Sequence, residues 1–168
     1  MSLVPPIRLL DHYAEHIAFD VLQQPESRPE KGIVFDNLGI DIAYDDPVPV
    51  DDDGAALERI AFRMTVRVND ANDTPAAVAY RAVIGLRGLF ERQSLSDLAD
   101  PPPEETYLMH TVASAVASLY GAARELLIVL SGPAPFGKVL LPSISPAHAA
   151  QQMLRKQSAP PPGDVDEP

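Results

Sequence analysis

The sequence predicts an α+β fold, in which a four-stranded antiparallel sheet with meander connections precedes a long helix and a short C-terminal helix. Two observations predict it. Apolar and polar residues alternate in four segments between residues 7 and 90, which is typical of strands with one buried face. Residues 113–130 are mostly small or aliphatic, and their only charged residues are one Arg-Glu pair. Leucines recur among them at three- and four-residue spacing, which indicates a buried helix.

The four strands are predicted at residues 7–22, 32–44, 59–68 and 78–90. In the third, every second residue from Ile60 to Val68 is apolar, which gives the clearest alternation. Because the strands are joined by short connections, they are expected to form an antiparallel meander. The acidic segment 45–54 contains two prolines, which cannot donate a hydrogen bond to a strand ladder, and it is predicted to be a loop.

The long helix is predicted to begin after three prolines at residues 101–103. Glu104 and Glu105 suit its first turn, where the helix dipole favours acidic side chains. Its apolar stripe consists of four leucines, namely Leu119, Leu126, Leu127 and Leu130. A break rich in glycine and proline at residues 132–135 ends the helix.

The remainder of the chain predicts one domain and a tail. A short helix is expected at residues 147–156, so that residues 1–156 form a single domain. Residues 157–168 are rich in proline and acidic side chains and are predicted to be a disordered tail. We find no internal repeat.

Composition excludes several classes of protein. The net charge of −11 opposes a general affinity for nucleic acid or for anionic membranes. The absence of cysteine excludes disulfides and thiolate metal sites. Arg124 and Glu125 interrupt the apolar sequence of the long helix, and the aliphatic segment after them is far shorter than the ~20 residues of a membrane span, so no membrane insertion is expected. The first residues do not resemble a signal peptide, so a cytoplasmic location is expected.

Candidate catalytic and metal-binding motifs are weak. His12, Glu15 and His16 match an H-x-x-E-H zinc motif, but that motif requires a helix and its neighbours here alternate as in a strand. The acidic residues of segment 45–54 lack the glycine and glutamate spacing of a calcium-binding loop. We therefore expect no catalytic residues, no metal, no cofactor and no enzymatic activity.

Several segments resemble the SecB family of protein-export chaperones. The helix contains Leu119-Tyr120-Gly121-Ala122-Ala123-Arg124-Glu125, and a break with Phe136 then leads to Val139-Leu140-Leu141-Pro142-Ser143-Ile144. These are similar to the family's Tyr-Ala-Arg-Glu, Gly-Phe-Pro and Leu-Leu-Pro-Pro-Ile, in the same order. Tyr13 to Asp20 resembles the family's first strand, and Gly88-Leu89-Phe90 resembles the end of its fourth strand.

The resemblance implies an ATP-independent holding chaperone that keeps unfolded preproteins competent for translocation. It implies a homotetramer, assembled as a dimer of dimers, with a client-binding apolar groove. The residues that match the sides of that groove are Leu38, Ile40, Ile42, Val139, Leu140, Leu141 and Ile144. The structural alternative for each of them is an ordinary core position.

In the family, an acidic face of the sheet docks the SecA translocation motor. Asp20 keeps an acidic position of that face here, whereas His16, Arg81 and Val83 replace other residues of it. Three further arginines alternate onto the same face and are expected to make it locally basic. The sequence thus leaves two alternatives to the chaperone: a SecB-like interaction subunit that binds one protein partner through this face, and a metal-dependent hydrolase built on the H-x-x-E-H motif.

Overall fold

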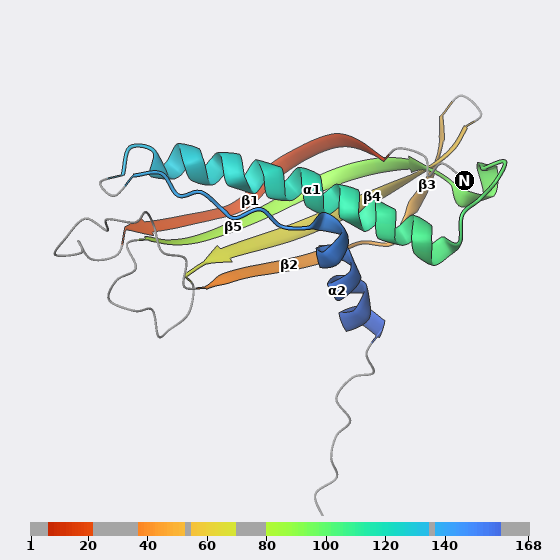
Figure 1. The fold of residues 1–168 in the computed structure, drawn as a ribbon. Helices are drawn as coiled ribbons and strands as arrows, with labels where there is room; N and C mark the ends of the chain where they lie inside the picture. Colours follow the sequence, from red (N-terminus) through yellow and green to blue (C-terminus); the bar gives the residue numbers. More distant parts are fainter. Residues whose placement is uncertain (1–6, 22–36, 53–54, 70–79, 135–136, 159–168) are drawn as a thin grey trace, which may run out of the picture.

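The computed structural model describes residues 7–21, 37–52, 55–69, 80–134 and 137–158. Their helices and strands, in chain order, are β1 (Arg8–Val21), β2 (Leu38–Tyr44), β3 (Val48–Asp52), β4 (Ala55–Val68), β5 (Tyr80–Gln93), the short 3-10 helix η1 (Leu95–Asp97), α1 (Glu104–Ser131) and α2 (Pro146–Ser158). The predicted α+β class is confirmed, with an antiparallel sheet, a long helix and a short one (Figure 1). Most of the predicted C-terminal tail lies outside the described residues.

The sheet differs from the predicted meander in strand order. Its order is β1-β5-β4-β2, so that β1 lies beside β5 rather than beside β2. β4 pairs with both β2 and β5, so the second, third and fourth predicted strands are neighbours in their predicted order. The alternation of side chains predicts which face of a strand is buried, but not which strand lies beside it. Residues 22–36 separate β1 from β2 by more than a tight hairpin turn, so the sequence did not require these two strands to be neighbours.

A fifth strand, β3, lies within the predicted loop 45–54. It pairs with the first part of β4, and β2 pairs with the second part, so that β2 and β3 form one interrupted edge of the sheet. The amide of Asp45 continues this edge by donating to the carbonyl of Ala61 at 3.0 Å. Pro49 is tolerated in β3 because an edge strand pairs on one side only.

The core lies between one face of the sheet and α1. Alternate side chains of β4 and β5 point into it, and those of Phe62, Val66 and Ile84 are fully buried. The packing is close at Gly88, where an added Cβ would lie 2.8 Å from the Phe90 ring and 2.9 Å from a methyl group of Leu119. Glycine at this position allows the helix to approach the sheet.

The first turns of α1 are attached to the sheet by polar contacts. Arg92 forms an ion pair with Glu58 at 2.8 Å, donates to the Thr111 hydroxyl at 2.9 Å and lies 4.6 Å from the centre of the Tyr107 ring. The Tyr107 hydroxyl donates to the carbonyl of Gln93 at 2.6 Å. Arg92, Tyr107 and Thr111 therefore all have polar partners at this end of the helix.

Helix α1 is a core helix along much of its length. Glu104 and Glu105 occupy its first turn as predicted, and Gly132 follows its last residue. Of the predicted stripe, Leu119 and Leu127 are buried, whereas Leu126 and Leu130 are partly exposed. Its length and composition also satisfy the criteria for a membrane span, a test that the core helix of a soluble protein passes equally.

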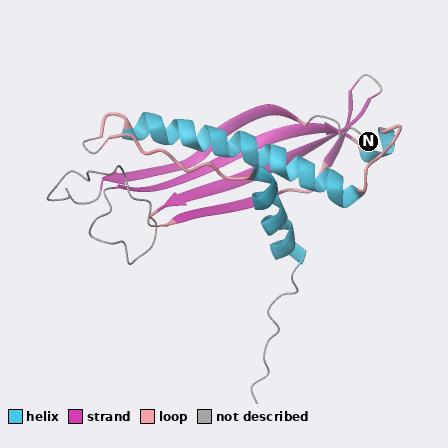
Figure 2. Cartoon of the chain, in the orientation of Figure 1, coloured by secondary structure: helices cyan, strands magenta, loops and turns pink. Residues whose placement is uncertain are grey.

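Both helices lie on the same side of the sheet, as Figure 2 shows. Helix α1 packs over β5, β4 and β1, while β2 faces the shorter helix α2. This arrangement covers the centre of the apolar face fully and the β2 edge only in part.

Candidate functional site

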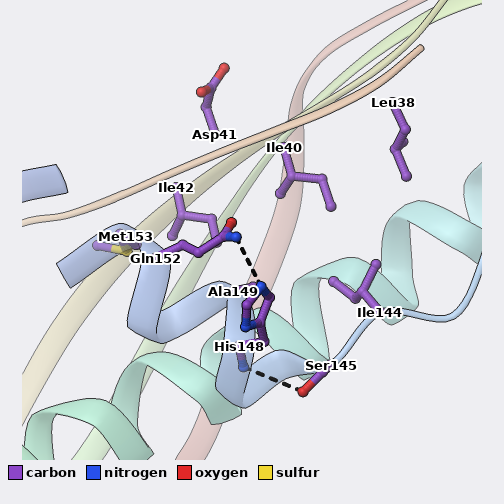
Figure 3. A pocket seen from close by; sticks show the side chains of 10 residues that line it. All are labelled: Leu38, Ile40, Asp41, Ile42, Ile144, Ser145, His148, Ala149, Gln152 and Met153. Atoms are coloured by element: carbon purple, nitrogen blue, oxygen red, sulfur yellow. Dashed lines mark hydrogen bonds between the residues drawn. The ribbon is translucent and has the colours of Figure 1, made fainter. Parts of the chain in front are cut away.

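An apolar groove lies between β2 and α2. Its volume is about 500 Å³. The apolar side chains that line it are those of Leu38, Ile40, Ile42, Ile144, Ala149 and Met153, and the other lining residues are Asp41, Ser145, His148 and Gln152. In Figure 3 the three β2 side chains point toward α2, whereas Asp41 points away from it.

The wall formed by β2 follows from the two-residue period of a strand. Ile40 pairs with Val66 of β4, whose side chain is fully buried, so both side chains are on the helix-facing side of the sheet. Because β2 is at the sheet edge, beyond α1, its aliphatic side chains remain half-buried. Asp41 is on the opposite side, where it forms an ion pair with Arg67.

The opposite wall is formed by α2 and by the segment that leads into it, residues 137–145, which we call the strap. Ser145 caps α2, because its hydroxyl accepts a hydrogen bond from the amide of His148 at 3.3 Å, and Pro146 occupies the first helical position. Gln152 and His148 form a side-chain hydrogen bond at 2.9 Å along the exposed rim. The groove thus combines apolar walls with a polar rim.

The seven residues predicted to bind a client separate into three groups. Leu38, Ile40, Ile42 and Ile144 come together in the groove. Leu140 is 59% exposed but is not among the lining residues. Val139 and Leu141 are 1% and 2% exposed, so they are core residues, which corrects the expectation that they form an accessible surface.

The strap explains this division. It is an extended segment, so alternate side chains point in opposite directions: Val139 and Leu141 inward, Leu140 outward. Sequence reasoning also missed the contribution of α2. Ala149 and Met153 line the groove at a spacing of four residues, and this helical spacing was a readable signal within the predicted helix 147–156.

The predicted docking residues lie on the other face of the sheet. Asp20 pairs with Arg81 and Ala18 pairs with Val83 across β1 and β5. Asp20 is exposed, whereas Arg81 and Val83 are partly buried. The Nε atom of Arg81 is buried and has no hydrogen-bond partner among the described residues.

The arginines on this face do not leave it basic. Within the described residues, Asp45 lies 3.4 Å from both Arg63 and Arg87, and Arg87 also lies 3.7 Å from Glu15. Arg59 forms an ion pair with Glu91 at 3.1 Å. Acidic side chains of neighbouring strands therefore neutralise much of the charge that the arginines carry.

The H-x-x-E-H segment lies in β1 and not in a helix. An irregularity of the strand falls between Ala14 and His16, so that His12 pairs with Gly88, on the helix side, and His16 pairs with Gly85, on the opposite side. The two imidazole groups thus point to opposite faces of the sheet and cannot bind one metal ion. Within the described part of the chain, no group of three metal-binding side chains lies together.

Two tyrosine hydroxyl groups are shifted in pKa. Desolvation by burial raises the pKa of Tyr120, and the charge of Arg124 lowers it in part. The pKa of Tyr107 is also raised, mainly by burial, with Arg92 acting in the opposite direction and Glu58 in the same one. Both groups are neutral hydrogen-bond donors at physiological pH.

Comparisons with known proteins assign no family. No family model matches the chain, and no curated protein matches it. The solved structure of the Mycobacterium tuberculosis Rv1957 SecB-like chaperone, in complex with a ChAD peptide from the Rv1956 HigA1 antitoxin, is 20% identical, with 83% of this chain and 91% of that chain covered and a TM-score of 0.42. A protein of unknown function from Streptococcus agalactiae is 14% identical, with coverages of 84% and 100% and a TM-score of 0.49. Similarities at this level establish neither an activity nor a partner.

Proposed function

We propose that this protein is an ATP-independent holding chaperone that binds extended, non-native polypeptide segments in the groove between β2 and α2. The observation that carries the proposal is the groove itself. Aliphatic side chains at every second position of an edge strand face a partly open apolar hollow. The sequence resemblance to the SecB family supports the same function independently of this geometry.

The groove suits segments of varied sequence. Its apolar walls recognise apolar surface by a non-directional interaction, and its polar residues Ser145, His148 and Gln152 hydrogen-bond to one another at α2. An aliphatic side chain contributes about 1.5–3 kcal/mol when it is fully buried, so a few client side chains give weak, reversible binding per groove. Tight holding then requires several grooves acting on one client.

Several copies in one assembly would supply those grooves. We therefore include a homotetramer, a dimer of dimers, in the proposal, together with a cytoplasmic location and delivery of preproteins for export. Apolar surface outside the groove supports assembly: β1 is an edge strand with Tyr13, Ile17 and Val21 exposed, and Val129 of α1 is 71% exposed. Delivery to SecA would use the face of Asp20, Arg81 and Val83.

The test is aggregation of a chemically denatured client, followed by light scattering with and without the protein. We expect suppression by the wild type and its loss in Ile40→Asp, which places a charge in the groove. Val48→Asp is the matched control, because Val48 is an aliphatic strand residue that is 60% exposed and outside the groove. Equal suppression by both variants, or none by the wild type, would remove the proposal.

The alternative is a SecB-like interaction subunit that binds one folded partner through the face of β1 and β5. The charged residues of this face favour it: exposed Asp20 lies beside partly buried Arg81, and a folded partner of complementary charge would bind such a surface. Binding would then weaken with added salt and in Arg81→Glu. A complex that is indifferent to both changes, but sensitive to Ile40→Asp, would favour the groove instead.

A further inference from the structure

Two hydroxyl groups of α1 attach the strap to the helix. Ser131 Oγ accepts a hydrogen bond from the amide of Val139 at 2.7 Å and donates to the carbonyl of Leu127 at 2.5 Å. Tyr120 donates its hydroxyl to the carbonyl of Pro142 at 2.8 Å. The two bonds lie at either end of the buried pair formed by Val139 and Leu141. The strap is thereby held against α1 in a single register.

The second bond lies close to the groove. Pro142 precedes Ile144 by two residues, and Ile144 lines the groove immediately before the capping residue of α2. An extended segment that shifts by one residue exchanges its inward and outward side chains. Such a shift would withdraw Ile144 from the groove and move the start of α2. The distance between the two walls therefore depends on where the strap is fixed.

We propose that Tyr120 and Ser131 are positioning residues of the groove, and that they set its wall opposite β2 through the strap. Neither residue lines the groove, so neither contacts an occupant there. The inference rests on the proposed function, because it states which residues outside the groove determine its affinity for extended apolar segments. It also makes a claim about the strap that can be measured without any occupant.

The same helix offers a matched control for each residue. Tyr107 is another buried tyrosine of α1 that donates to a backbone carbonyl, but its acceptor is Gln93 at the end of β5. Ser118, like Ser131, donates to the carbonyl four residues before it, at 3.1 Å, and no contact with the strap is seen among its described hydrogen bonds. Tyr107→Phe and Ser118→Ala thus remove the same chemical groups without releasing the strap.

The experiment measures two quantities on the full chain. The first is the Kd for a short fluorescein-labelled peptide that alternates leucine with serine, determined by fluorescence anisotropy. The second is amide hydrogen exchange over residues 137–145, determined by mass spectrometry. We expect Tyr120→Phe and Ser131→Ala to raise Kd about three- to tenfold and to accelerate exchange in the strap. We expect the two control variants to change Kd by less than about twofold and to leave strap exchange unchanged.

The outcomes separate this inference from the proposed function. Unchanged strap exchange in Tyr120→Phe and Ser131→Ala overturns the inference. Faster exchange with unchanged Kd overturns it as well, because the strap would then not determine affinity. Equal losses of affinity in the test and control variants would indicate general destabilisation and also overturn it. A wild type that binds no peptide removes the proposed function, and strap exchange alone then decides whether the hydroxyl groups hold the strap.

Discussion

The sheet has one apolar face, but its two parts are covered differently. Over β4 and β5, α1 excludes water from nearly every inward side chain, and Phe62 and Ile84 are fully buried. Over β2, the shorter helix α2 leaves an open hollow, and Ile40 and Ile42 remain half-buried. The strands carry the same kinds of residue in the same alternation. What distinguishes core from groove is therefore the position of the covering helix.

This comparison shows how the proposed binding site can be made from core-like residues. Aliphatic side chains at an edge strand are stable in water when a helix shields part of them, and the remainder is available to a ligand. Substitutions in the two parts of the face should then differ in whether they lower stability or binding. Changes under α1 should affect stability, and changes beside α2 should affect binding.

The largest expected effect is the loss of stability in Phe62→Ala. Phe62 packs against Phe90 with ring centres 5.3 Å apart and against Tyr44 at 5.6 Å. Removal of a fully buried aromatic ring leaves a cavity and should lower the free energy of unfolding by about 3–5 kcal/mol. Urea denaturation followed by circular dichroism measures it. A loss below about 1 kcal/mol would contradict the complete cover that we describe over β4.

Gly88→Ala should have the next largest effect. The added methyl group would meet the Phe90 ring and Leu119 at less than 3 Å, so these side chains or the helix must shift, at a cost of about 1–3 kcal/mol. Gly85→Ala is the control, because the nearest atom to its new Cβ is 3.5 Å away, on the opposite face of the same strand. Equal unfolding midpoints for the two variants would show that Gly88 does not set the approach of α1.

Ile40→Ala should weaken binding strongly and lower stability only slightly. Because Ile40 is half-buried at the sheet edge, its truncation should cost less than about 1.5 kcal/mol of stability. It should nevertheless weaken binding of an extended apolar peptide about five- to tenfold, since the lost methyl groups face the groove. Denaturation and anisotropy on the same preparation test both halves of this prediction. Full affinity in the variant would place the binding surface elsewhere.

Alkaline pH should destabilise the protein through Tyr107 and Tyr120. Their pKa values are raised in the folded state above the ordinary tyrosine value of 10.0, so the unfolded chain ionises first. The stabilising contribution of each hydroxyl is therefore complete below about pH 10 and is lost as the pH rises through the folded-state pKa. Urea midpoints measured from about pH 8 to pH 11 should fall less steeply in the Tyr120→Phe variant. An identical slope would contradict the assignment.

The smallest effect on stability is expected on the face of the sheet opposite α1 and α2. Arg67→Gln removes an exposed ion pair with Asp41, which should change stability by no more than about 0.5 kcal/mol. Groove binding should not change at all, because the Asp41 side chain points away from α2. Denaturation at low and high salt provides the measurement. A large, salt-sensitive loss would mean that the ion pairs of this face act as one network.

Much of the fold could be predicted because periodicity reports burial directly. The alternation from Ile60 to Val68 identified the inward face of β4, and the leucine spacing together with residues 132–135 gave the extent of α1. Strand order could not be predicted in this way, since β1 pairs with β5 over a long sequence separation. β3 was missed because Pro47 before it and Pro49 within it were taken to exclude a strand, although an edge strand tolerates proline.

The groove could be predicted in part for the same reason. Alternation placed Leu38, Ile40 and Ile42 on one face of a strand, but their assignment to a groove, like that of Ile144, came from the resemblance to the SecB family. Val139 and Leu141 could not be separated from Leu140 by composition, because only contacts with α1 decide which side of the strap is buried. The orientation of His12 and His16 depends on the register shift between Ala14 and His16 in β1, which the residue types do not predict.

The order of the elements along the chain has a consequence for biosynthesis. The five strands of the described chain all leave the ribosome before α1, so the apolar face of the sheet has no cover until residues 104–131 have been made. A protein that is proposed to shield other nascent chains is thus itself at risk during translation. We expect its newly made sheet to depend on transient binding by another chaperone, or on rapid completion of synthesis, until α1 packs against it.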